Sequence, residues 1–164
     1  FILCIFKGIN FKQYYIMIKH HIIMFIVNIL IGMAFNPMNL LAYRIDDLYL
    51  SYTLFYGGIA MASNMIWSHE IINYLAGGSF NINTFLIGIG CILVITYIMR
   101  KQLFIDDQQW LRRMISHHST AITTSKKLLE NKKAMRQNPV LYRLAKDIVY
   151  NQEREIAQMK NMLN

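Results

Sequence analysis

Three apolar stretches, each close to the length of a bilayer crossing, constrain this chain more than any other feature. They run over about residues 14–35, 48–67 and 83–99, and a helix needs about 20 apolar residues to cross the hydrocarbon core. Hydrophobic residues make up 55% of the chain and charged residues 16%, which is too apolar for an ordinary soluble domain of this size. The sequence therefore predicts three transmembrane helices in contact with lipid. Gly58 and Ala62, spaced four apart, predict a close helix approach on the second.

The first and second stretches carry or adjoin a few polar residues. Lys19, His20 and His21 lie near the start of the first stretch, where long polar side chains reach the headgroup level. A polar ion path within the bilayer is the alternative. Residues 68–70 read Ser-His-Glu, only half of an HExxH zinc signature. A nucleophile elbow and a phosphate loop are also missing from the sequence, so we do not expect an enzyme.

The C-terminal part of the chain is basic. From Arg100 onward the sequence holds thirteen Lys or Arg and six Asp or Glu, and the whole chain has a net charge of +8. Aromatic residues do not interleave with the basic ones as in a nucleic-acid patch, so nucleic acid is not an expected partner. Anionic lipid headgroups beside a span are the simpler partner for this charge.

The part beyond the third stretch has the features of a helical hairpin. It contains no glycine and one proline, Pro139. We expect one helix to continue from the third span to about Glu130, because no helix breaker intervenes. A polar turn follows, and a second helix begins at Pro139, capped by Asn138, and extends to about Met162. The predicted fold is all-α, with three transmembrane helices followed by an antiparallel hairpin.

Polar and sulfur-bearing side chains gather on the predicted facing stripes of this hairpin. The set is Met114, His117 and His118 on the first helix, and Gln152, Glu155 and Met159 on the second. An antiparallel fold about the turn pairs His117 with Gln152, Met114 with Glu155 and Trp110 with Met159. A buried carboxylate or imidazole without a partner is costly, so either internal hydrogen bonds or a metal ion should compensate. Imidazole and thioether groups together suit copper better than magnesium or calcium.

The hairpin sequence resembles a known family. The segments "IDDQQWLRRMISHHSTAITTSKKLL" and "NPVLYRLAKDIVYNQEREIAQMKNML" resemble the domain of unknown function 305 family over about Ile105–Leu163. The resemblance implies a ferritin-like helical architecture, and for some members copper binding. It implicates as ligands Met114, His117, His118 and Met159, with Gln152 and Glu155 in support. It departs from the family at Thr124, where many relatives carry methionine.

The resemblance also implies a membrane-anchored branch of that family, with three spans in residues 1–101 and the hairpin domain in 102–164. In such relatives the hairpin lies on the non-cytoplasmic side, whereas the distribution of positive charge slightly favours the cytoplasmic side. We expect a membrane-anchored protein that binds or buffers copper. A non-catalytic structural or assembly subunit of a larger membrane complex is the alternative. A single helical pair leaves part of its apolar surface uncovered, so a homodimer forming a four-helix bundle, or a larger assembly, is expected.

Overall fold

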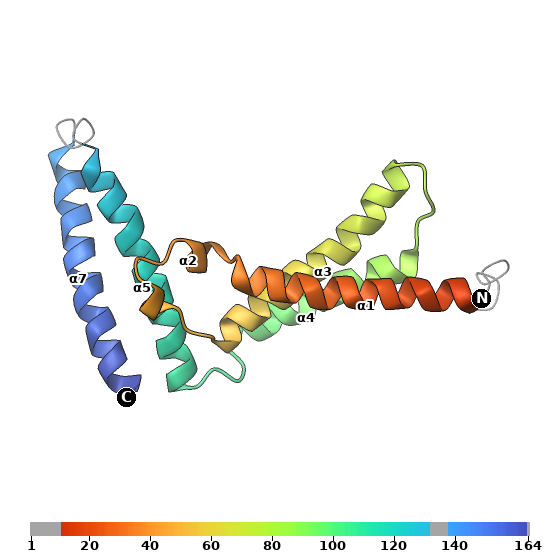
Figure 1. The fold of residues 1–164 in the computed structure, drawn as a ribbon, viewed down its shortest axis with the longest axis horizontal. Coiled ribbons are helices and arrows are strands. Elements are labelled where there is room, and N and C mark those ends of the chain that lie inside the picture. The colour runs from red at the N-terminus through yellow and green to blue at the C-terminus, as the bar shows by residue number, and fades with distance from the viewer. Residues whose placement is uncertain (1–10, 132–137, 164) are drawn as a thin grey trace. The chain divides into compact units, whose positions relative to one another are not determined.

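A computed structural model describes residues 11–131 and 138–163, and every regular element in those residues is helical (Figure 1). In chain order the elements are α1 (Phe11–Ala34), α2 (Pro37–Leu40), the 3-10 helix η2 (Ile45–Asp47), α3 (Tyr52–Leu75), α4 (Ile82–Arg100), α5 (Asp107–Glu130) and α7 (Pro139–Leu163). The predicted all-α class is confirmed. Most of the predicted turn, residues 132–137, lies outside the described residues.

The prediction of one continuous helix from the third span into the hairpin is wrong. α4 ends at Arg100, and α5 begins only at Asp107. Between them Gln102 and Phe104 adopt φ angles of 51° and 62°, the left-handed region that interrupts a right-handed helix. Asp106 then caps α5, because its side chain accepts a hydrogen bond from the Gln109 amide at 2.7 Å. An N-cap carboxylate thus starts a new helix where the sequence has no glycine or proline.

The chain divides into two compact units, each described here by itself. One, the apolar unit, comprises the residues up to Gly32 together with Gly58–Tyr97. The other, the hairpin unit, comprises Met33–Gly57 together with the chain from Ile98 onward. The sequence assigned residues 33–57 to the membrane domain. The structure groups them with the hairpin, because they pack against α5.

Two helices among the described residues are long and apolar enough to cross a membrane. They are the stretches Ile18–Leu40 and Ile82–Arg100, and they include most of α1 and all of α4. Their apolar side chains are largely uncovered by protein, with Ile22, Leu30 and Leu93 between 54% and 65% exposed. A core helix of a soluble protein would bury such residues, whereas these two helices leave most of them exposed.

Small residues let the helices of the apolar unit approach closely. Gly32 of α1 lies so near α3 that a Cβ atom there would be 3.2 Å from the Gly58 Cα. Gly58 and Ala62 are both buried in α3, which confirms the predicted close approach at this pair. A Cβ atom on Gly88 of α4 would be 2.9 Å from the Trp67 backbone nitrogen of α3. The close packing of α1, α3 and α4 therefore depends on glycine at these positions.

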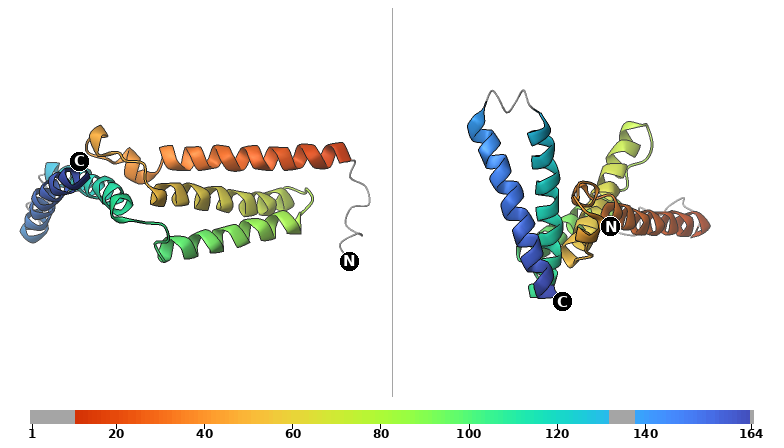
Figure 2. Two further views of the ribbon diagram at one scale, coloured as in Figure 1. Left: turned by 90° about the horizontal axis from the view of Figure 1, so that it is seen from below. Right: turned by 60° about the vertical axis from the view of Figure 1, so that its left-hand side comes forward.

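In the hairpin unit α5 and α7 run antiparallel, side by side (Figures 1 and 2). The buried apolar cluster between them consists of Leu111, Ile115, Ile122, Ile156 and Met159. The predicted inward stripe of α5 is rotated relative to this cluster, because Trp110 is 49% exposed and His117 is also exposed. The reason is that α5 is covered on two sides, by α7 and by the segment that contains α2 and η2. Its most buried face lies between these two neighbours.

We expect Gly88→Ala to destabilise the apolar unit. The added methyl group would lie 2.9 Å from the Trp67 backbone nitrogen and 3.0 Å from its Cβ atom, so α4 has to move away from α3. Overpacking of this kind costs about 1–3 kcal/mol. Thermal unfolding of the full chain in detergent micelles measures the loss as a lower melting temperature.

Gly90→Ala is the matched control, two residues along the same helix. A Cβ atom there has no heavy atom within 4 Å, and alanine is a better helix former than glycine by about 0.5–1 kcal/mol. Its melting temperature should equal or slightly exceed that of the wild type. An equal decrease of the melting temperature in the two variants would contradict the close α3–α4 contact.

Candidate functional site

A buried carboxylate, Asp47, holds the segment before α3 against the hairpin. Its side chain is 1% exposed. The Ser119 hydroxyl of α5 donates a 2.6 Å hydrogen bond to Asp47 Oδ2, and Lys160 Nζ of α7 lies 2.7 Å from Asp47 Oδ1. The Ser116 hydroxyl also donates to the backbone carbonyl of Asp47 at 2.9 Å. Asp47, the last residue of η2, therefore contacts both helices of the hairpin.

A second carboxylate extends this ion pair toward solvent. Lys160 Nζ lies 2.9 Å from Asp46 Oδ2, and Arg44 Nε donates to Asp46 Oδ1 at 2.9 Å. These hydrogen bonds from Lys160 and Arg44 lower the pKa of Asp46 to about 2. Burial by itself would lower the pKa of Lys160, but its hydrogen bonds to Asp47 and Asp46 outweigh burial and raise that pKa. Asp46 and Lys160 are therefore both charged at neutral pH.

Serine and threonine hydroxyls of α5 also form hydrogen bonds with backbone groups elsewhere in the segment before α3. The Tyr43 amide donates to Ser119 Oγ at 2.8 Å, and the Thr120 hydroxyl donates to the Met38 carbonyl at 3.1 Å. Lys126 Nζ lies 3.9 Å from the centre of the Tyr43 ring, a cation–π contact. Hydroxyl groups of α5 thus satisfy backbone groups of this segment.

The sequence alone did not predict this network of hydrogen bonds and ion pairs. The available signals were an Asp-Asp pair at residues 46–47, and two serines three apart on α5, at 116 and 119. Serines at this spacing share one helix face, but they predict no partner. Only the fold brings Asp47 to them.

A histidine and a glutamate meet across the seam of the hairpin. His118 Nδ1 of α5 lies 3.1 Å from Glu155 Oε2 of α7, with the two side chains 13% and 41% exposed. Burial lowers the pKa of His118, Glu155 partly opposes the shift, and neighbouring His117 adds to it. The net direction is down, so the imidazole is neutral at pH 7. Neutral imidazole is the form that binds metal ions.

The register of the hairpin differs from the predicted one by about one helical turn. The sequence pairing placed Met114 opposite Glu155 and His117 opposite Gln152. In the structure His118 lies at Glu155, and Met114 packs against the apolar cluster that contains Met159.

The structure thus places His118 beside Glu155, and Met114 against the cluster that contains Met159. We call these four of the six predicted residues the interhelix site. His117 is exposed, with its ring centre 6.1 Å from that of His118. The expectation that both imidazoles point inward therefore holds only for His118. Gln152 is half-buried and one turn from Glu155 on the same helix.

A cleft of about 560 Å³ lies beside the ion pair, between the segment and α7. Its lining includes Arg44 and Lys160 as well as Asp46 and Asp47. These four groups form ion pairs with one another, and Glu153, which also lines the cleft, forms an ion pair with Lys126.

These features define a helical-hairpin domain attached to apolar helices, and comparison with known proteins gives it a family. Residues 100–163 match the model of the Domain of unknown function (DUF305). An uncharacterized protein of Acanthamoeba polyphaga mimivirus is 37% identical over 129 residues, which cover 79% of this chain and 82% of that protein. No solved structure matches the chain. The chain belongs to the family of this viral protein, and its C-terminal part is a DUF305 domain.

We expect Lys160→Met to destabilise the hairpin unit by about 3 kcal/mol, because removal of one partner leaves a buried charge without compensation. The charge left behind is that of Asp47, which is 1% exposed. Denaturant unfolding of the full chain in micelles measures the loss, with Trp67→Phe in every variant so that fluorescence reports Trp110 alone.

Lys127→Met is the control for this substitution. Lys127 forms an exposed ion pair with Glu130 on the same helix, and such pairs contribute about 0–1 kcal/mol. If the two lysine variants unfold at the same denaturant concentration, the buried pair with Asp47 does not stabilise the unit.

We expect His118 to titrate below its ordinary pKa of 6.5, as measured by NMR of histidine-labelled protein. Glu155→Gln should lower the pKa of His118 further, because the carboxylate is the group that opposes burial. Since the folded pKa is below the unfolded one, the unfolded state binds more protons, and stability decreases as the pH falls below about 6.5. A His118 titration midpoint at or above 6.5 would contradict the burial seen at this seam.

Proposed function

We propose that this protein is a membrane-anchored metal-binding protein whose hairpin holds copper at the interhelix site. The observation that carries the proposal is the approach of His118 Nδ1 to Glu155 Oε2, 3.1 Å across the seam. Met114 and Met159 lie one helical turn away on the same two helices, and both contribute to the apolar cluster. Nitrogen, oxygen and sulfur donors therefore occur together on two facing surfaces.

The donor set suits copper in its reduced state. Thioether and imidazole are soft and borderline ligands, and they select Cu(I) over magnesium or calcium. Glu155 either joins the shell or fixes the tautomer of His118, as carboxylates do beside metal-bound histidines. In this proposal the exposed His117 receives the ion from solvent, and Gln152 supports Glu155.

The position of the segment before α3 supports three membrane crossings. Asp47 contacts Ser119 of α5, so the segment and the hairpin lie on the same side of any membrane. α3 and α4 connect them, so both of these helices cross or neither does. Because α4 is apolar enough to cross, α3 crosses with it in this proposal, and α1 supplies the third span.

The proposal keeps the hairpin on the non-cytoplasmic side, as the resemblance to the family implies. The proposal also includes self-association, because the α7 side chains of Leu144 and Tyr150 are 54% and 68% exposed. Apolar side chains of this kind favour a second hairpin as a neighbour. The segment around Asp47 already covers one side of α5, so a partner would pack on the remaining sides.

A structural or assembly subunit is the second candidate, and one observation favours it. The distance of 3.1 Å between His118 Nδ1 and Glu155 Oε2 is within the length of a hydrogen bond, so a reorientation of the two groups that aligns this bond would stabilise the pair without an ion. In that case the polar pair fixes the register of the hairpin, and the protein acts through its contacts with other chains.

We expect the full chain in micelles to bind Cu(I) with a 1:1 stoichiometry in competition with a chromophoric Cu(I) chelator. Met159→Leu and His118→Ala should each weaken binding at least about tenfold, because each removes one donor. Leucine conserves the volume of methionine, so Met159→Leu should cost less than about 1.5 kcal/mol of stability.

Met162→Leu is the matched control, because Met162 is 70% exposed and lies three residues from Met159. It should bind Cu(I) as the wild type does. If the wild type binds no Cu(I), or if Met159→Leu and Met162→Leu bind equally, the interhelix site does not hold copper. The structural candidate would then remain.

A further inference from the structure

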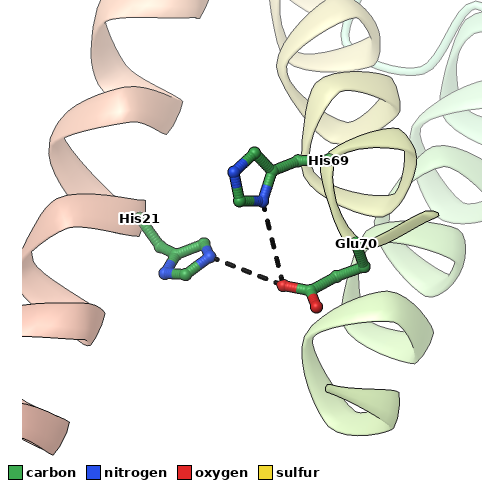
Figure 3. Close-up of side chains that lie close together, drawn as sticks. All are labelled: His21, His69 and Glu70. Carbon is green, nitrogen blue, oxygen red and sulfur yellow. Dashed lines mark ion pairs between the residues drawn. The ribbon is translucent and has the colours of Figure 1, made fainter. Parts of the chain in front are cut away.

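We propose a second metal site, formed by His21, His69 and Glu70 in the apolar unit, that takes a divalent transition ion such as Zn²⁺. This site lies outside the DUF305 domain, and it does not rest on the proposed copper function. His21 comes from α1, whereas His69 and Glu70 are neighbours near the end of α3 (Figure 3). The three side chains point toward one another across the α1–α3 contact.

The distances between the donor atoms fit an ion better than they fit direct hydrogen bonds. His21 Nε2 lies 3.7 Å and His69 Nδ1 lies 4.0 Å from Glu70 Oε1. Both exceed the length of an N–H···O hydrogen bond, about 2.7–3.2 Å. Zinc bonds of about 2.0–2.2 Å place tetrahedral donors about 3.4 Å apart, so the two histidine–glutamate distances have to shorten by about 0.3 and about 0.6 Å when an ion binds. One donor from each residue lies within 4.8 Å of the others.

The burial of Glu70 calls for a positive charge. Glu70 is 4% exposed, and within the described part of the chain its ion-pair partners are the two histidines, with no Lys or Arg among them. A buried carboxylate without compensation is costly. A divalent ion compensates the carboxylate and uses both imidazoles as ligands.

A neighbouring backbone group orients the carboxylate. The Asn81 amide, just before α4, donates to Glu70 Oε2 at 3.0 Å. This bond engages one oxygen and leaves Oε1 facing the histidines, which is the arrangement by which second-shell contacts orient a metal ligand. The His69 Nδ1 atom is shielded from solvent and makes no hydrogen bond within the described residues, as a nitrogen reserved for an ion would.

The location near a helix end gives ions access. Glu70 lies five residues before the end of α3 at Leu75, which is about 7.5 Å along the helix axis. This depth corresponds to the boundary between the hydrocarbon core and the headgroups. A water molecule from that boundary supplies the fourth ligand, because two imidazoles and one carboxylate leave one tetrahedral position open. The bound ion joins α1 to α3.

The test is a Co²⁺ titration of the full chain in micelles after chelator treatment, because Co²⁺ replaces Zn²⁺ and absorbs visible light when tetrahedral. The background carries His118→Ala and Met159→Leu, so the hairpin contributes no signal and failure of the copper proposal leaves this result unaffected. We expect one equivalent of Co²⁺ to produce the tetrahedral band and Zn²⁺ to displace it. Glu70→Gln and His69→Ala should each weaken binding at least about 100-fold, more than loss of a second-shell group.

His20→Ala is the matched control, because His20 is exposed and its ring centre lies 5.8 Å from that of His21. It should bind Co²⁺ as the background protein does. Zn²⁺ should also raise the melting temperature of the background protein, a measurement that does not depend on whether a site variant folds. Absence of binding and of this thermal shift in the background protein would overturn the proposal. Equal affinities of His20→Ala and Glu70→Gln would do the same.

Discussion

The buried ion pair between Asp47 and Lys160 is the constraint on which the hairpin unit depends. The pair joins α7 to a segment more than a hundred residues earlier in the chain, and the Ser119 hydroxyl connects the same carboxylate to α5. Burial of a charge is costly unless geometry and hydrogen bonds are both favourable. Here each oxygen of the carboxylate has its own partner. The arrangement therefore fixes three elements in one relative position, and with them the register at which His118 meets Glu155.

The two metal proposals use different chemistry in different surroundings. The interhelix site combines two thioethers and an imidazole on amphipathic helices, and His117 beside it is exposed. In the apolar unit a carboxylate and two imidazoles lie among helices with uncovered apolar faces. Sulfur donors favour a soft monovalent ion, and a nitrogen–oxygen set favours a divalent one. The two sites are therefore distinguishable by the identity of the ion, independently of the substitutions.

The hairpin was the part of the fold most accessible to sequence reasoning. Glu130 and Pro139 bound the turn as expected, because capping and the conformational limits of proline act over a few residues. The stripe predicted on α7 is confirmed only in part, because Ile156 and Met159 are buried whereas Leu144 is 54% exposed. The stripe predicted on α5 is rotated away from the buried face, because a second neighbour covers the helix. Periodicity indicates that a helix has a buried face, but the number of elements packed against it decides where that face is centred.

What the sequence determined by itself is local: the helical class, the apolar stretches, the ends of the hairpin and the set of residues able to bind metal. What only the tertiary structure decided is which of these residues meet. The grouping of His21 with Glu70, the pairing of Asp47 with Lys160, and the shift of one helical turn at Glu155 all join positions far apart in the chain. Helix propensity and hydrophobic periodicity act over one or two turns and carry no information about such distances. Those contacts follow from side-chain packing and from the need to compensate buried charge.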